Sequence, residues 1–393
     1  MRPGTSSLIL CAALAGLGLL SGCQSLGRPE ANAPPAVHAT PTLPAPVAMH
    51  EFSVKPGDDV IGEIQVVKAR EDDTLSDIAR RFNVGYEEIV AANPGVDPWV
   101  PKAGTEVVIP TEFVLPDAKR QGIVINVAAM RLFYFPKTKP GEPQKVITHP
   151  IGIGRVGWRT PEGSTRIVSK TAAPTWTPTP AIRKEHAANG DPLPEVVPPG
   201  PDNPMGSRAM KLGWPEYAIH GTDKPPSIGL RGTHGCLRLY PEDIVSIYDA
   251  IPVGTRVTVV NQPFLVGWQG DTLVMQTYSV LEDDKRKHRP DQLISLARKK
   301  AARTSARGGV AVNEALVAEI TKKPRAIAVP ISTPDLTLDQ YLADALRVRN
   351  ELPLNATWDG GTSPPLTSAD ATKQAEAPDY QSRLPDAGDG NVR

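Results

Sequence analysis

The sequence predicts a mainly β domain in the middle of the chain, preceded by a small βααβ domain and followed by a helical extension. Short β-rich runs separated by turn residues fill residues 121–261, which is typical of a sandwich or barrel and not of a parallel α/β sheet. Apolar residues at helical spacing lie between two β-branched runs over residues 65–111. A hairpin pattern at 262–282 then leads into amphipathic helical patterns over 283–350.

The first 22 residues have the pattern of an export signal. A charged start precedes the apolar run Leu8–Leu20, which is too short to span a bilayer. The run ends in Leu20-Ser21-Gly22-Cys23, which resembles the bacterial lipobox, whose cysteine is lipidated and becomes the mature N-terminus. This resemblance implies a lipid anchor at Cys23, and Gln24 in place of an aspartate implies the periplasmic face of the outer membrane. The alternative is a plain secretory signal with an incidental cysteine.

Composition limits the partners and marks the segments that lack a core. The formal net charge is zero, which gives no electrostatic reason to expect a nucleic acid partner. The chain has 42 prolines, and they cluster outside the apolar runs. Residues 23–60 therefore read as the lipid anchor and a Pro/Ala-rich linker of polyproline II character. Residues 351–393 are rich in Asp, Pro, Thr and Gly and predict a disordered tail.

The βααβ domain begins with a strand at Val66-Val67. A helix follows, with Leu75 and Ile78 on its apolar face and Asp73 or Thr74 as the N-cap. We expect a second helix over 86–92 and a closing strand over 105–110, because β-branched residues gather there.

This stretch resembles the LysM module. The resemblance is carried by Asp73-Thr74-Leu75, Ile78-Ala79 with Phe82, Ala92-Asn93 and the final run Gly104–Pro110. It implies binding to glycans that contain N-acetylglucosamine, such as peptidoglycan strands. Asp72 stands where the family usually has glycine, so binding by this copy is left open. The alternative is a small domain that only packs on its neighbour.

Within the β domain the expected strands are separated by one long loop. Residues 174–206 hold many prolines and little apolar periodicity, and a loop of that length predicts a lid or substrate wall. A short helix is expected over 241–248, with Pro241 near its first position. The strands are expected at 122–127, 130–135, 145–154, 163–171, 209–212, 217–220 and 256–260, and the later helices at 291–302, 313–320 and 338–348.

Cys236 is the candidate nucleophile. It remains alone in an exported chain once Cys11 leaves with the signal and Cys23 carries lipid, so it has no internal disulfide partner. A thiol with a pKa of about 8.5 needs a base, and His220 can supply one if Cys236 starts or ends a neighbouring strand. The amides of Gly235 and Cys236 are candidates for an oxyanion hole. By ligand type His220, His234 and Cys236 could instead hold zinc, but coordination would quench the nucleophile.

The motif His220-Gly221-Thr222, followed after a loop by Thr233-His234-Gly235-Cys236-Leu237-Arg238, resembles the catalytic domain of YkuD-type L,D-transpeptidases. The resemblance covers residues 121–261 and is similar to the Gram-negative ErfK/YbiS-like branch. It implies a β-sandwich with Cys236 as nucleophile, His220 as general base and acid, and the carbonyl of Gly221 orienting the imidazole. In the motif, Thr233 and His234 shape the nucleophile turn. Arg238 is expected to meet a substrate carboxylate or, alternatively, to form a structural ion pair.

The activity implied by the resemblance is ping-pong acyl transfer in cell wall organisation, without cofactor or metal. Cys236 would form a thioester with a peptidoglycan tetrapeptide stem, release D-alanine and pass the acyl group to an amine. The acceptor is either a second stem, giving a 3→3 cross-link, or an outer-membrane lipoprotein. Two alternatives stay open: hydrolysis of the thioester as a carboxypeptidase or amidase, and a non-catalytic glycan-binding anchor.

Overall fold

The computed structural model describes residues 43–47, 50–302 and 310–361. The chain divides into two compact units, Met1–Thr42 and Leu43–Arg393, and every described residue belongs to the second. Several expected segments lie outside the described residues: the signal peptide, Cys23, the linker as far as residue 42, and residues 362–393 of the tail. These expectations therefore stay predictions.

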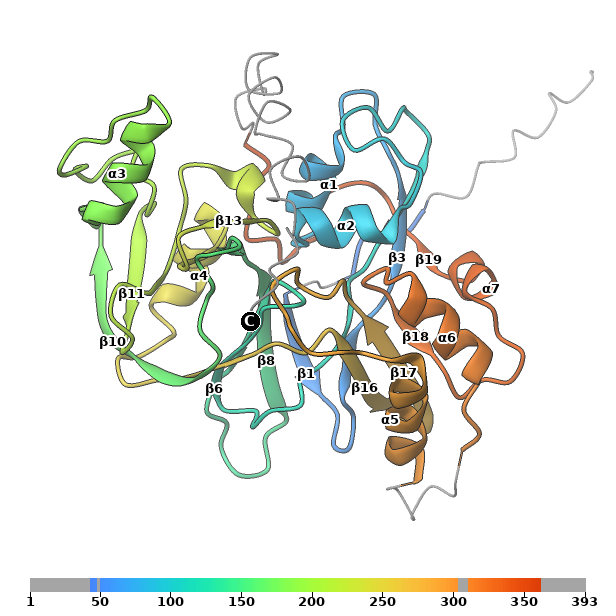
Figure 1. Cartoon of the computed structure of the whole chain (residues 1–393). Helices are drawn as coiled ribbons and strands as arrows, with labels where there is room; N and C mark the ends of the chain where they lie inside the picture. The colour runs from blue at the N-terminus through green and yellow to red at the C-terminus, as the bar shows by residue number, and fades with distance from the viewer. Residues whose placement is uncertain (1–42, 48–49, 303–309, 362–393) are drawn as a thin grey trace, which may run out of the picture. The chain divides into compact units, whose positions relative to one another are not determined.

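The mainly β domain is built on one large sheet. Its nine described strands run in the order β1-β8-β7-β6-β15-β10-β11-β12-β14 (Figure 1). Neighbours are antiparallel except for β6 with β15 and β12 with β14, which are parallel. The strands are β1 Glu51–Val54, β6 Gly122–Asn126, β7 Arg131–Phe135, β8 Gln144–Pro150, β10 Gly163–Ala172, β11 Arg208–Leu212, β12 Ala218–His220, β14 Leu237–Arg238 and β15 Arg256–Val260.

Both faces of this sheet are buried in its central part. On β6, Ile123 and Ile125 belong to one apolar cluster, whereas Val124 between them belongs to another. Because side chains alternate across a strand, the two clusters lie on opposite faces. Helix α4 (Pro241–Tyr248) packs into the first cluster through Ile244. Burial on both faces explains why these strands read as continuous apolar runs in the sequence.

The domain that resembles LysM has the expected order of strand, helix, helix and strand. These elements are β3 Gln65–Lys68, α1 Leu75–Arg81, α2 Tyr86–Ala92 and β4 Glu106–Ile109. Thr74 is the N-cap of α1, and its hydroxyl accepts a hydrogen bond from the amide of Asp77, whose side chain accepts one from the amide of Thr74. The apolar face predicted for α1 is fully buried at Leu75 and Ile78.

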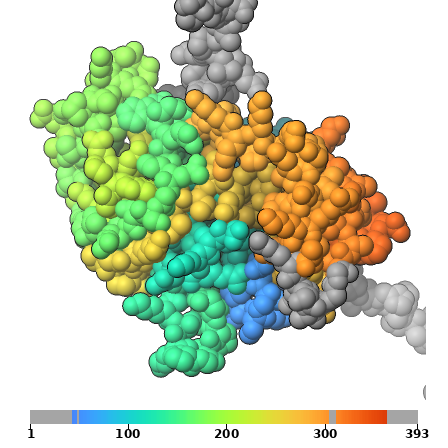
Figure 2. All heavy atoms as spheres, turned by 60° about the horizontal axis from the view of Figure 1, so that its bottom comes forward, coloured from blue at the N-terminus to red at the C-terminus, as the bar shows by residue number. Residues whose placement is uncertain are grey.

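A second sheet follows β15, the last strand of the large sheet, along the chain. The expected hairpin forms β16 (Phe264–Gln269) and β17 (Thr272–Thr277), and β17 also pairs with β18 (Ala328–Pro330). Helices α5 (Pro290–Ala302) and α6 (Glu314–Lys322) pack beside it. Figure 2 shows this region, in orange, against the turquoise and blue segments of the chain.

Two boundaries expected from the sequence are wrong, and the helical extension also contains strands. The linker was expected to reach residue 60, but β1 is an edge strand of the large sheet, and β2 (Val60–Gly62) pairs with β5 (Glu112–Val114). The helix expected over 338–348 ends early, as α7 (Leu338–Ala343), and β19 (Leu346–Arg347) then pairs with β3. The extension at 283–350 thus contains two strands besides its helices. Their hydrogen-bond partners lie far away in the sequence, so the local pattern does not predict these strands.

The Pro-rich stretch 174–206 is not a plain loop. It contains helix α3 (Pro180–Ala188), with Pro180 at its first position and the hydroxyl of Thr179 accepting a hydrogen bond from the amide of Ile182. Of the helix, only Ile182 is buried, so the apolar periodicity that reveals a helix is absent. Figure 1 shows α3 beyond one end of the β10–β11 pair.

Candidate active site

The two candidate catalytic residues lie on adjacent strands. β12 ends at His220, and Cys236 directly precedes β14, its parallel neighbour. In the register of this pair Ile219 is opposite Leu237 and His220 is opposite Arg238. Cys236 thus lies immediately before a strand that neighbours the strand of His220, which is the arrangement under which the sequence allows His220 to serve as its base. Both side chains line one cleft with a volume of about 540 Å³.

The imidazole of His220 is held by the main chain. Its Nδ1 lies 2.6 Å from the carbonyl oxygen of Gly221. Because a carbonyl can only accept, Nδ1 carries the proton and Nε2 is left with its lone pair. Burial, the largest cause, and the positive charge of Arg238 together lower the pKa of His220 to about 4, against the hydrogen bonds to Gly221 and Met205, which raise it. His220 is thus a neutral base at neutral pH.

The thiol of Cys236 is also neutral before reaction. Burial raises its pKa, although a hydrogen bond from the amide of Ala218 and the charge of Arg238 act in the opposite direction. Sγ donates to the carbonyl of Glu216 at 3.5 Å. Among the described residues Cys236 is a free, partly buried cysteine. The site therefore holds a thiol and a neutral imidazole in one cleft, and not a resting thiolate and imidazolium.

The turn before the thiol is fixed by Thr233 and Gly235. The hydroxyl of Thr233 accepts from the amide of Gly235 at 3.0 Å and donates to the carbonyl of Cys236 at 2.7 Å. Gly235 has a φ of +104°, and a Cβ there would lie 2.6 Å from Cε1 of Tyr217. The carbonyl of Gly235 accepts from Thr160 at 2.9 Å. Only glycine fits this position without strain.

One expectation for this turn needs correction. The amide of Gly235 was expected to serve in an oxyanion hole, but it already donates to the hydroxyl of Thr233. Gly235 contributes instead through its positive φ, which lets the backbone turn just before the thiol. The amide of Cys236 remains as the candidate donor from this turn.

His234 contacts the Pro-rich stretch and not the turn itself. Its Nε2 lies 3.3 Å from Oε2 of Glu185 on α3 and 3.3 Å from Nη2 of Arg155. Its ring meets Trp158 edge to face, with centroids 4.8 Å apart. Burial lowers the pKa of His234, and Arg155 lowers it further. The side chain of His234 thus links the nucleophile segment to α3, and its turn-shaping role stays a prediction.

Arg238 makes no ion pair within the described part of the chain. Arg238 is one of the residues that line the cleft, and its buried Nε atom has no hydrogen-bond partner among the described residues. Burial lowers its pKa, whereas Asp223 and Cys236 raise it. The alternative of a structural ion pair is therefore not seen among the described residues, and contact with a substrate carboxylate stays a prediction.

Much of the cleft wall comes from the Pro-rich stretch, as expected for a substrate wall. Trp176, Ile182 and Met205 line it on this side, and Trp214 and Tyr217 line it next to the thiol. Glu185, Arg155 and the amide of Ala218 were not predicted from the sequence. Thr179-Pro180 is a helix-start signal that could have indicated α3 and hence the place of Glu185. Arg155 and the amide of Ala218 reach the site only through the folded chain, so no local signal marks them.

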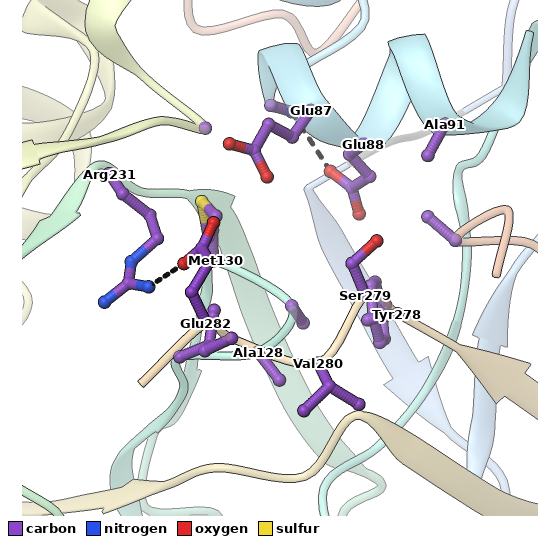
Figure 3. A pocket seen from close by; sticks show the side chains of 15 residues that line it. Glu87, Glu88, Ala91, Ala128, Met130, Arg231, Tyr278, Ser279, Val280 and Glu282 are labelled. Carbon is purple, nitrogen blue, oxygen red and sulfur yellow. Dashed lines mark hydrogen bonds and ion pairs between the residues drawn. The ribbon is translucent and has the colours of Figure 1, made fainter. Parts of the chain in front are cut away.

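A second cavity lies where α2 approaches the segment before Cys236. Figure 3 shows Glu87 and Glu88 of α2 on one side and Arg231, Met130 and Glu282 on another. The dashed line from Arg231 marks its ion pair with Glu282. Neither Cys236 nor His220 lines this cavity. It belongs to the contact between the LysM-like domain and the β domain.

Comparison with known proteins identifies both domains. Residues 120–259 match the family model described as L,D-transpeptidase catalytic domain, and residues 67–110 match the LysM domain. The chain is 47% identical over 210 residues to the probable L,D-transpeptidase YbiS of Escherichia coli K12, covering 53% of this chain and 67% of the relative. It is 36% identical over 280 residues to the probable L,D-transpeptidase ErfK/SrfK of Salmonella typhimurium LT2, covering 70% and 89%.

The chain belongs to the L,D-transpeptidase family. Its fold, a mainly β catalytic domain preceded by a LysM domain, agrees with the expectation from the sequence. Within the described ranges of this family member, no helix is long and apolar enough to cross a membrane. Over the same ranges, no group of three His, Cys, Asp or Glu side chains could hold a metal ion.

Proposed function

We propose that the chain is a peptidoglycan L,D-transpeptidase of the cell envelope, with Cys236 as nucleophile and His220 as general base and acid. The observation that carries this proposal is the neutral imidazole, fixed by the Gly221 carbonyl, on the strand beside the thiol. The names of the relatives agree with this activity.

The first half-reaction forms a thioester. Nε2 of His220 takes the thiol proton as Sγ of Cys236 attacks the carbonyl carbon of the third stem residue, across the L,D peptide bond. The amide of Cys236 donates to the oxygen that becomes negative. The C–N bond then breaks, and D-alanine leaves with the proton held by His220. Arg238 binds a carboxylate of the stem peptide.

The second half-reaction transfers the acyl group to an amine. His220 takes a proton from the attacking amine, the C–S bond breaks, and Sγ receives the proton back. The acceptor is the side-chain amine of another stem, which gives a 3→3 cross-link, or the lysine of an outer-membrane lipoprotein. The LysM domain supplies affinity for the glycan strands that carry the stems. The anchor is a lipid on Cys23, which holds the enzyme on the periplasmic face of the outer membrane.

One incubation tests the activity. The chain from residue 24 onward is mixed with a disaccharide-tetrapeptide, and the products are read by mass spectrometry. Cross-linked dimers support transfer, trimmed monomers support hydrolysis, and unchanged substrate supports a glycan-binding anchor. A Cys236→Ala protein that retained full activity would overturn the nucleophile assignment. A carbapenem should add its mass to the wild-type protein at Cys236, and an unmodified protein after long exposure would count against the thioester chemistry.

A fractionation experiment tests the anchor. Replacing Cys23 by alanine should move the protein from the membrane fraction to the soluble periplasmic fraction. If the variant stays with the membrane, the lipobox assignment is wrong. The wild-type protein, separated into inner and outer membranes, shows whether Gln24 directs it to the outer one.

A further inference from the structure

We propose that the LysM domain is a positioning element of the catalytic centre, because it holds both flanks of the segment 230–239 that carries Cys236. This role is separate from the binding of glycan. It rests on the proposed nucleophile, and the experiment below is chosen so that failure of one proposal can be told from failure of the other.

The flank before Cys236 is bonded to the start of α2. The amide of Tyr86 donates to the carbonyl of Ile228 at 3.1 Å, and the amide of Glu87 donates to the carbonyl of Gly229 at 3.2 Å. Gly229 has a φ of +81°, and a Cβ there would lie 2.2 Å from the amide nitrogen of Tyr86 and 2.5 Å from Cα of Gly85. The two backbones are therefore in direct contact, two residues before β13 (Arg231–Thr233) and seven residues before the thiol.

The flank after Cys236 is bonded to α1 and the turn that follows it. Arg80 donates to both carboxylate oxygens of Glu242, at 2.8 and 2.9 Å. The side-chain amide of Asn83 donates through Nδ2 to both carboxylate oxygens of the fully buried Asp243, at 2.9 and 2.8 Å. The hydroxyl of Tyr240 donates to the main-chain carbonyl of Val84 in the LysM domain, at 3.2 Å. These partners start two residues after Arg238.

A third contact ties α2 to the large sheet itself. Glu88 accepts from Nε and Nη2 of Arg131 on β7, at 3.2 and 2.7 Å, and both side chains are buried. Figure 3 shows Glu87 and Glu88 on α2, with Arg231 across the cavity that lies beside the first flank. An interface that relies on buried polar pairs fixes one orientation, because any other leaves the charges unpaired.

The consequence concerns the distance between thiol and substrate. A displacement of about 1 Å at a reacting atom can cost about a hundredfold in rate. A segment clamped on both sides keeps the thiol in place, and loosening one clamp lets it move. If the LysM domain served only to recruit glycan, the acylation of Cys236 by a small β-lactam, which has no glycan, would not depend on this interface.

The experiment measures carbapenem acylation of Cys236 by intact mass in the same protein from residue 24 onward. Arg80→Glu and Glu242→Arg should each lower the maximal acylation rate about tenfold or more, with little change in the carbapenem concentration for half-maximal rate. The double variant R80E/E242R restores the pair with reversed charges and should recover most of the rate. Val100→Ala, on an exposed LysM position, is the matched control and should acylate like wild type.

The outcomes separate the two proposals. Absence of a wild-type adduct removes the proposed nucleophile and this inference with it. A normal wild-type adduct with unchanged rates in Arg80→Glu and Glu242→Arg overturns the positioning role alone. A double variant that melts like wild type but stays slow also overturns it. Should the reversals unfold the protein, Glu242→Gln decides: a slower rate at an unchanged melting temperature supports the role, and an unchanged rate refutes it.

Discussion

The pH dependence of acylation is a direct test of the neutral thiol–imidazole pair. The perturbation is a change of pH from about 7 to about 5, and the group that responds is His220, whose pKa is lowered from 6.5 to about 4 by burial. At pH 5 a base with a pKa of about 4 is about nine-tenths neutral, whereas an ordinary histidine is about 3% neutral. We therefore expect the acylation rate at pH 5 to stay within about twofold of its value at pH 7.

The assay is the single-turnover rate of carbapenem acylation at Cys236, followed by intact mass at each pH. A thiolate–imidazolium pair would behave differently, because its rate falls as the thiolate takes up a proton. A loss of more than about tenfold between pH 7 and pH 5 would falsify the neutral pair. His234→Gln serves as a control, since that histidine is assigned no proton transfer and its replacement should leave the shape of the profile unchanged.

The same pKa predicts acid sensitivity of the fold. Above about pH 6.5 His220 is neutral in both the folded and the unfolded chain, so its protonation takes nothing from the free energy of unfolding. As the pH falls from 6.5 toward 4, the unfolded chain takes up a proton that the buried imidazole refuses. Stability is then lost by about 3 kcal/mol, the size that a pKa difference of this magnitude implies. Chemical denaturation at pH 6.5 and at pH 4 measures the change in the free energy of unfolding. This change also includes the contributions of other groups that titrate between these pH values.

Three substitutions test the rest of the site. Gly235→Ala should lower stability by about 1–2 kcal/mol and nearly abolish acylation, because it forces a Cβ at positive φ against Tyr217; wild-type melting and rate would contradict this. Arg238→Met should raise KM for the tetrapeptide substrate at least about tenfold and leave melting intact, since it removes a charge-assisted bond; an unchanged KM would exclude the carboxylate contact. Glu185→Gln removes the charge that pairs with Arg155 and accepts from His234. It should raise KM several-fold, about as the loss of one partly exposed ion pair would, with kcat little changed; an equal loss in kcat would place Glu185 nearer the chemistry.

The sequence was sufficient for the central strands of the large sheet and for the placing of Cys236 and His220 in one cleft. β6, β7 and β15 are recognisable because their residues are apolar on both faces of a buried sheet. Cys236 and His220 stand out by residue type and spacing, and the parallel pairing of β12 with β14 brings them into one cleft as expected.

The rest depends on long-range contacts that no local pattern records. β1 has a buried side chain only at Val54, and it pairs with a strand about ninety residues away, so it reads as linker. α3 buries only Ile182, which hides its period. The amide of Gly235 looks available in the sequence, and only the fold shows that the Thr233 hydroxyl already uses it.

The backbone contact between Gly85 and Gly229 bears on how this protein can be rebuilt. A grafted LysM domain from another wall enzyme would have to carry a residue without a side chain at the position of Gly85, since a Cβ there would lie 2.9 Å from Cα of Gly229. It would also need an asparagine and an arginine in register with Asp243 and Glu242. Chimeras that keep only the glycan-binding residues should therefore pack poorly at the interface between the two domains. A chimera should carry these contact residues over together with the grafted domain.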